Sequence, residues 1–481
     1  MRLPLSALDK HYVLSRRALA CPDGWRHDRF EDLHLFTARH IRRHPLQDES
    51  GRQIGMIVGW IIGGDGVLRD GSPVQAGQGT GLAGRTAELC GRFLVVGRDE
   101  PEAAPLLLPD ACGLLPAVYA PSEETVAGTP AMLADLFGLA PDESVRAAFP
   151  IPERFGWIPF GRTPWEGAWR LLPRHALDLE RFSVSRFEED APGDGERGPI
   201  GPIFDRVAAN CTTLARDPDT RPHLTAGYDS RMVLSAWLAG AEPRPFVTLR
   251  TPGPGGRIDV ATAATLARRC GLAHEVRTWQ PPEKADLDEW HARTGYCISD
   301  HVAALATTLK GWNPGEIQVT GTCGEVGRAF YWDGADITRD MPDAADLVAR
   351  LGVTRADWLL HEAHAWLETL PEMSAPDLWD RAYVEQRLGC WGGPSVFGSS
   401  LHVPSMSPFN SRAIISRMLA MPAAERAGER FARAFVARAD PGLARIATNT
   451  PLGLRKLVEP KATLKSIAKV YVPRALLKFL K

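Results

Sequence analysis

The residues best placed to do chemistry lie in the stretch HLTAGYDSR, residues 223–231. Apolar and β-prone residues lead into a small turn, and an apolar run with helical spacing follows as far as Gly240. We therefore expect a strand, a tight loop and a helix. The first turn of a helix has backbone N–H groups without partners and attracts anions, and a nearby carboxylate can bind Mg²⁺. This stretch predicts a pyrophosphate site made of Leu224, Thr225, Ala226, Gly227, Asp229 and Ser230.

The turn is not a Walker loop, because no Gly-Lys-Ser/Thr follows it. An ordinary turn from strand to helix would carry the same residues, so a second feature is needed. The second feature is another loop, VTGTCGEVGR at residues 319–328. It contains Gly321 and Glu325 and also follows an expected strand. Cys323 in this loop has no His close to it in sequence, so we expect a buried thiol there and not a nucleophile.

Helices and strands are expected to alternate after Phe204. We predict helices at 204–215, 230–239, 259–270 and around 286–310, and strands at 222–225, 245–249, 275–279 and 317–321. This alternation is typical of a parallel, doubly wound sheet, which binds ligands beyond the carboxyl ends of its strands. Both loops, residues 225–230 and 321–325, follow such ends. We therefore expect them to face one crevice.

The first third of the chain has a different pattern. Short apolar runs at 55–63, 92–96 and 105–108 are separated by Gly, Pro and Asp, which predicts a mainly β layer or sandwich. Residues 188–202 are rich in acids, Gly and Pro and are expected to form a loop. The length of 481 residues exceeds what one core usually supports. We expect two domains, 1–185 and 203–481.

The composition is that of an ordinary globular protein, with 44% hydrophobic residues, 24% charged residues and a net charge of −2. Nothing in it predicts a nucleic-acid partner. The eight cysteines are scattered without a Cys-x-x-Cys pair, which suits a reducing cytoplasm. The most apolar run, residues 56–64, is too short to span a membrane. The basic amphipathic stretch 461–481 could contact a membrane surface or an acidic peptide, or pack on its own domain.

Several ordered segments resemble the asparagine synthetase family. The family's Ser-Gly-Gly-x-Asp-Ser pyrophosphate loop is similar to residues 225–230, and its Ser-Gly-x-Gly-x-Asp-Glu strand end is similar to residues 320–325. Further likenesses lie at 91–119, at 155–175, at 259–274 and at 405–426, so the resemblance covers about 90 to 450. It implies a sandwich domain like that of class II amidotransferases, followed by an ATP-pyrophosphatase domain with a doubly wound parallel sheet.

The resemblance also implies roles for single residues. Asp229 and Glu325 would bind Mg²⁺, Gly321 would belong to the ATP/pyrophosphate site, and Glu325 would be catalytic. The carboxylate of the substrate would attack the α-phosphate of ATP, which gives an acyl adenylate and pyrophosphate. The family's phosphate-stabilising Lys is not in register here, so either Lys456 or Lys461 would take its place. Asp259 is expected to be a helix N-cap. Two roles stay open for each of three other residues. Arg231 could contact phosphate or form a surface ion pair, His274 could face the nucleotide or be structural, and Asn410 could face the second substrate or cap a helix.

One departure from the family changes the expected reaction. Family members hydrolyse glutamine with a Cys directly after the initiator Met, but here Arg2 follows Met1 and the first cysteine is Cys21. We therefore expect a sandwich domain without glutaminase activity. The amine would then belong to the substrate itself, as in lasso-peptide macrolactam cyclases and β-lactam synthetases.

The resemblance to these cyclases and synthetases implies a small-molecule or peptide acyl substrate. A precursor peptide and a leader protease could then be partners. Two alternatives stay open. One is an enzyme like asparagine synthetase, which uses aspartate with ammonia or glutamine. The other is a catalytically inactive scaffold of the same fold, because Thr322 or Cys323 replaces a family acid and the Lys is out of register.

Overall fold

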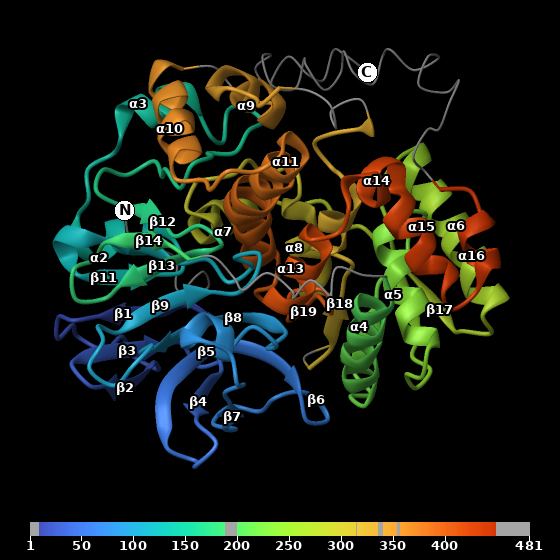
Figure 1. The fold of residues 1–481 in the computed structure, drawn as a ribbon, viewed down its shortest axis with the longest axis horizontal. Coiled ribbons are helices and arrows are strands. Elements are labelled where there is room, and N and C mark those ends of the chain that lie inside the picture. Colours follow the sequence, from blue (N-terminus) through green and yellow to red (C-terminus); the bar gives the residue numbers. More distant parts are fainter. Residues whose placement is uncertain (1–8, 188–199, 314, 335–339, 354–355, 449–481) are drawn as a thin grey trace.

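The computed structural model describes residues 9–187, 200–313, 315–334, 340–353 and 356–448. Two sheets occupy the first part of this chain, and their strands are antiparallel except for the parallel pair β4–β7. Parallel strands occupy the second part (Figure 1). The chain is therefore a mixed α/β protein, and its sheets change character between Arg186 and Ile200. Within the described residues, no helix is long and apolar enough to cross a membrane.

The first sheet has the strand order β12-β10-β11-β1-β3-β2, and all of its pairs are antiparallel. Its strands are β1 (Tyr12–Ser15), β2 (Arg26–Phe30), β3 (Leu33–Thr37), β10 (Val118–Ala120), β11 (Thr125–Ala127) and β12 (Trp169–Arg170). The second sheet has the order β14-β13-β9-β8-β5-β4-β7, with β6 paired to β5. Its strands are β4 (Arg43–Gln47), β5 (Gln53–Gly63), β6 (Gly66–Val67), β7 (Val74–Gln75), β8 (Gly91–Gly97), β9 (Leu106–Pro109), β13 (His175–Asp178) and β14 (Val184–Arg186).

The apolar runs expected at 55–63, 92–96 and 105–108 form β5, β8 and β9 of the second sheet, as predicted. Side chains from both sheets share one buried cluster, including Tyr12 and Leu35 from the first and Trp60 and Leu94 from the second. The first part also contains four short helices: α1 (Gly81–Arg85), η2 (Pro121–Glu123), α2 (Pro130–Phe137) and α3 (Glu143–Ala148).

The second part of the chain contains five parallel strands. β15 (Thr220–Pro222) pairs with β18 (Ile317–Val319), β18 pairs with β19 (Ser405–Met406), and β16 (Phe246–Arg250) pairs with β17 (His274–Thr278). A parallel bridge from His223 to Val247 joins the two groups. The strand order is thus β17-β16-β15-β18-β19. From β15 the chain adds β16 and then β17 on one side, and it then adds β18 and β19 on the other side. The carboxyl ends of β15 and β18 therefore flank the point where the direction of winding reverses.

Helices cover both faces of these strands. Phe246 and Val247 are adjacent in β16 and so point to opposite faces. Phe246 packs edge-on against Trp237 of α5 (Tyr228–Leu238), and α6 (Pro254–Arg269) contacts the same strand. Val247 shares a buried cluster with Leu309 of α8 (Ala303–Lys310). The expected alternation of helix and strand is therefore observed, although most boundaries move by a few residues. The helical region expected around 286–310 forms two helices, α7 (Lys284–Thr294) and α8.

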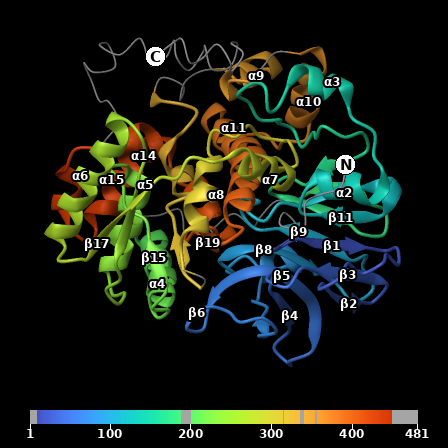
Figure 2. The same ribbon diagram turned by 180° about the vertical axis from the view of Figure 1, so that it is seen from behind.

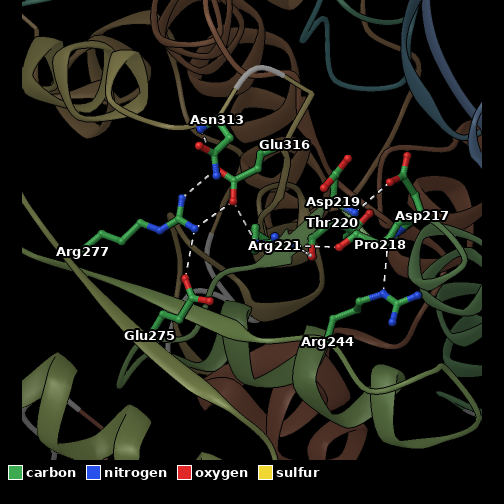
Figure 3. A network of polar contacts seen from close by, with 10 residues as sticks. All are labelled: Asp217, Pro218, Asp219, Thr220, Arg221, Arg244, Glu275, Arg277, Asn313 and Glu316. Carbon is green, nitrogen blue, oxygen red and sulfur yellow. Dashed lines mark hydrogen bonds and ion pairs between the residues drawn. The ribbon is translucent and has the colours of Figure 1, made fainter.

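A buried ion-pair network joins β15, β17 and the residue that precedes β18 (Figure 3). Glu316, 2% exposed, precedes β18 and accepts two hydrogen bonds of 2.9 and 3.0 Å from Arg277 of β17. Arg221 of β15 lies 3.0 Å from the same carboxylate. Burial would raise the pKa of Glu316, but these cations and hydrogen bonds lower it overall. Glu316 is therefore ionised and its charge is balanced within the fold.

The rest of the second part is helical and lies against both the sheet and the sandwich (Figures 1 and 2). Its remaining elements are α4 (Ile200–Ala215), α7 (Lys284–Thr294), η3 (Gly324–Arg328), α9 (Ala344–Leu351), α10 (Asp357–Glu368), α11 (Ala375–Ala382), the π-helix η5 (Tyr383–Gly392), α12 (Gly393–Ser399), α13 (Arg412–Leu419), α14 (Ala423–Arg426), η6 (Ala427–Glu429), α15 (Arg430–Ala437) and α16 (Pro441–Arg445). Pro173, in the segment 155–175, packs against Gly113 and Gly389.

Candidate functional site

The first loop, residues 225–227, joins β15 to α5 and is held by its own side chains. Thr225 N–H donates to Ser230 Oγ at 3.0 Å, and Gly227 N–H donates to Thr225 Oγ1 at 3.2 Å. Ala226 N–H donates to Asp259 Oδ1 at 2.9 Å. The amides of Ala226 and Gly227, which were expected to be free for an anion, are therefore paired in this structure.

Donors remain in the first turn of α5. Within the described part of the chain, the backbone N–H groups of Tyr228, Asp229 and Ser230 form no hydrogen bond to protein. These are the orphan donors of a helix start, where the helix dipole is also positive. Gly227 caps the helix, and a Cβ there would meet only Thr225 Oγ1, at 3.5 Å. An anion can therefore approach the first turn over Gly227.

Asp259 does not cap its helix, contrary to the prediction. The helix α6 starts five residues earlier, at Pro254, after Gly253 in a left-handed conformation. Proline is favoured in the first turn because its missing N–H would have had no partner there. Asp259 therefore lies inside the helix, and its carboxylate reaches across to Ala226. This hydrogen bond from Ala226 to Asp259 holds the first loop against α6.

The second loop follows β18 and backs directly onto the first. A Cβ on Gly321 would lie 2.3 Å from the carbonyl carbon of Asp229, so only glycine fits. Cys323 has a left-handed backbone with φ 74° and starts the 3₁₀ turn η3, which carries Glu325 and Arg328. The thiol of Cys323 is fully buried and burial raises its pKa, which fits the buried thiol expected there and not a nucleophile.

The two loops bring the two expected metal ligands, Asp229 and Glu325, to one place, the crevice. Burial and the nearby Asp229 raise the pKa of Glu325 to about 8. Burial also raises the pKa of Asp229, although Arg328 opposes this by donating to Asp229 Oδ2 at 3.0 Å. Among the described residues, Asp229 Oδ1 and Glu325 Oε2 are buried and have no hydrogen-bond partner. Two acids that lie close together and have unsatisfied oxygens are suited to binding a cation, and Arg328 meets only part of that need.

Three further residues at this crevice carried no recognisable signal in the sequence. Burial, followed by the charges of Glu325 and Asp229, raises the pKa of Tyr383 at the start of η5. Arg387 lies one turn further along. Burial lowers its pKa, and the charge of Glu325 opposes this. Its guanidinium stacks on Trp391, 3.9 Å from the ring centre. Glu429 adds a third negative charge near Asp229. A ten-residue π-helix is rare and is often found at functional sites.

Arg231 has a structural role that neither expectation included. It is fully buried and donates to the carbonyl oxygens of Ala226, Leu443, Ile446 and Ala447. It therefore fastens the end of the described chain to the back of the first loop. It neither faces a phosphate nor makes a surface ion pair. Lys456, Lys461 and the basic stretch 461–481 lie outside the described residues.

The remaining candidates are satisfied by protein partners. Leu224 is buried, and its N–H and carbonyl bond to Val247 and to the Thr248 hydroxyl. His274 Nε2 lies 2.8 Å from Thr248 Oγ1, which fits the structural role weighed for it. Asn410 does not cap a helix, since Ser411 is the N-cap of α13. It is buried, donates to Gly91 O and Asp110 Oδ1, and accepts from Cys112 N–H.

The fold and crevice define a mixed α/β protein with two polar loops at the carboxyl ends of neighbouring parallel strands. A search against models of known protein families finds no match, and a search of curated proteins finds no similar sequence.

Proposed function

We propose that the chain is an ATP-dependent ligase that adenylates a carboxylate and couples it to an amine, like the asparagine synthetases its sequence resembles. One observation carries this proposal. Asp229 and Glu325, far apart in sequence, meet beside the first turn of α5 with buried, unpartnered oxygens. The reversal of winding between β15 and β18 is where parallel sheets bind nucleotides and other ligands.

The residues present fit a magnesium ion. Mg²⁺ is commonly bound by one or two carboxylates and keeps water or phosphate oxygens at its other positions. No group of three His, Cys, Asp or Glu side chains suited to a metal occurs in the described part of the chain, so the metal would depend on phosphate oxygens as well. When bound, the ion would neutralise charge on the pyrophosphate leaving group.

The chain's own groups would hold the leaving group. The first-turn N–H groups of Tyr228, Asp229 and Ser230 point into a region of positive helix potential and are suited to phosphate oxygens. The hydroxyls of Thr225 and Ser230 hold the loop's shape through their 3.0 Å hydrogen bond. Arg328 could pass from Asp229 to a phosphate once a cation occupies the acids, because one guanidinium has several donors.

The expected lack of glutaminase activity bears on the source of the amine. Among the described cysteines of the first part, Cys21 is exposed in a loop and Cys90 and Cys112 are buried. We therefore propose that the substrate supplies its own amine and forms a macrolactam or a similar cyclic amide. The acyl substrate would be a small molecule or a peptide. A peptide substrate would require a precursor and a leader protease.

ATP–pyrophosphate exchange tests this proposal with candidate acids added one at a time. Exchange that depends on a peptide substrate supports the cyclase, and exchange with aspartate supports an enzyme like asparagine synthetase. No exchange with any acid, including peptides encoded beside the gene, would leave the inactive scaffold and contradict the proposal. The Asp229→Asn variant is the control, because it should lose exchange with every substrate.

A further inference from the structure

A cavity of about 510 Å³ lies between the sandwich and the second part of the chain, away from the crevice. The sandwich contributes Lys10, Arg42 and Trp60 to its wall. The second part contributes Trp312 and Ile317, which lie at the amino end of β18. The two acids lie beyond the carboxyl end of that strand, so the cavity and the crevice are separate. Its volume is that of a small-molecule site.

The cavity wall has an excess of positive charge. Lys and Arg side chains contribute four cations, at Lys10, Arg39, Arg42 and Lys310, against the two carboxylates of Asp9 and Asp70. Asp70 is already paired with Arg26 and with Arg43 outside the cavity, and Asp9 with His40. Lys310 is likewise paired with Asp286 outside the cavity. Lys10, Arg39 and Arg42 are therefore the wall cations that have no ion pair among the described residues.

Lys10 shows this imbalance most clearly. It is 6% exposed, and its backbone adopts a left-handed conformation with φ 56°. Burial, with Arg92 and Arg293 nearby, lowers the pKa of Lys10 to about 7. Within the described residues its Nζ donates to Ser400 O at 3.2 Å, which uses one of its three donors. A buried ammonium among arginines is unfavourable unless a negative charge joins it.

Two indole rings complete the cavity and are held firmly in place. Trp60 is 1% exposed and lies under the guanidinium of Arg92, 4.3 Å from the ring centre. Trp312 lies under Arg277, 4.0 Å from the ring centre, and Arg277 is in turn fixed by Glu316 (Figure 3). The cavity is much larger than one phosphate group. The space beside the indoles therefore suits an organic body attached to the anion.

We propose that this cavity binds a small phosphate monoester, with the phosphate at Lys10 and Arg42 and the organic part against Trp60 and Trp312. A doubly charged phosphate matches the charge excess of the wall, whereas a single carboxylate would neutralise only part of it. This inference does not depend on the proposed ligase activity.

Calorimetric titration of the full chain with phenyl phosphate, inorganic phosphate and benzoate tests the proposal. Phenyl phosphate should bind in a one-to-one ratio, and benzoate should bind at least about tenfold more weakly. The variant Lys10→Met should weaken phenyl phosphate binding by about tenfold or more. The same variant should keep or raise the unfolding midpoint of the free protein, because it removes a buried charge without an acidic partner.

The matched control is Lys284→Met, which removes an exposed lysine and should change neither affinity nor midpoint. No binding of phenyl phosphate to the unmodified chain would overturn the proposal. Unchanged affinity in Lys10→Met would overturn it as well. Binding that survives Lys10→Met but is lost in Asp229→Asn would place the phosphate in the sheet crevice and contradict the second site. Because ATP–pyrophosphate exchange is measured separately, failure here leaves the ligase proposal standing.

Discussion

At the scale of single residues, the crevice is defined by the unfavourable contact between Asp229 and Glu325. Each carboxylate is partly desolvated, Asp229 raises the pKa of Glu325, and among the described residues Arg328 forms an ion pair with Asp229 only. An arrangement that weakens the free protein is typical of a binding site, because the ligand restores the missing interaction.

The variant Glu325→Gln should therefore be more stable than the unmodified protein in the absence of metal. The pKa of Glu325 is about 8 in the folded protein and near its ordinary value when unfolded. Between these two pH values the folded protein holds a proton that the unfolded chain lacks, so stability falls as pH rises. The advantage of Glu325→Gln should grow from about pH 5 to about pH 8 and then level off, measured as the unfolding midpoint. A constant or shrinking advantage would contradict the raised pKa.

Pyrophosphate exchange by Glu325→Gln should fall about 100-fold or more, because an amide is a poor ligand for Mg²⁺. The matched control is Glu368→Gln, an exposed acid in α10, which should leave exchange unchanged. Unchanged exchange in Glu325→Gln would remove this residue from the reaction.

Single variants also show which lysine, Lys456 or Lys461, takes the place of the phosphate-stabilising lysine of the family. Lys456→Ala and Lys461→Ala each remove one candidate. One of the two should lower exchange by about 100-fold, as expected for the loss of a group that stabilises phosphate charge, while the other leaves it unchanged. Full exchange in both variants would show that neither lysine serves the phosphates.

At the scale of elements, the site depends on two loops that touch through their backbones. Gly321 leaves no room for a side chain against Asp229, and Arg231 ties the first loop to α16 and to the residues after it. Asp259 of α6 holds Ala226 from a third element. The loop geometry is thus set by packing from several parts of the chain and not by the loop sequence alone.

Gly321→Ala should destabilise the protein by about 2–3 kcal/mol, because its Cβ would overlap the Asp229 carbonyl and one loop must move. Chemical denaturation measures this loss, and exchange should fall with it. Gly255→Ala is the control, since a Cβ there meets nothing within 4 Å. Equal stability of the two variants would contradict the close contact of the loops.

At the scale of the whole molecule, the sandwich and the second part share a continuous buried core. Asn410 is a central point of contact, because it bonds to Gly91 O and to the buried carboxylate of Asp110. Asp110 also accepts hydrogen bonds from the backbone N–H groups of Leu114 and Leu115. This polar network lies inside the interface, so the two parts should unfold together.

Asn410→Ala should lower the free energy of unfolding by about 3 kcal/mol, because it leaves buried polar groups of both parts without partners. Asn210→Ala removes one half-buried hydrogen bond to Pro408 and should cost about 1 kcal/mol. Denaturation followed by fluorescence should show one transition in each case. Two separate transitions in the unmodified protein would contradict the shared core.

Sequence patterns predicted much of this architecture, since the spacing of apolar residues depends on which face of an element is buried. The strands that became β5, β8 and β9 and the meeting of residues 225–230 with Glu325 were predicted in this way. The start of α6 was predictable from Pro254 but was placed too late. The contacts of Arg231, Asp259 and Asn410 were not, because each joins segments far apart in sequence.

The central claim is that Asp229 and Glu325 together hold a divalent cation on pyrophosphate. A crystal structure with Mn²⁺ and pyrophosphate tests it most directly, because Mn²⁺ gives an anomalous signal. We predict a peak about 2 Å from Asp229 Oδ1 and Glu325 Oε2, with pyrophosphate on the first turn of α5. Pyrophosphate bound elsewhere, or a metal peak away from both carboxylates, would contradict the account.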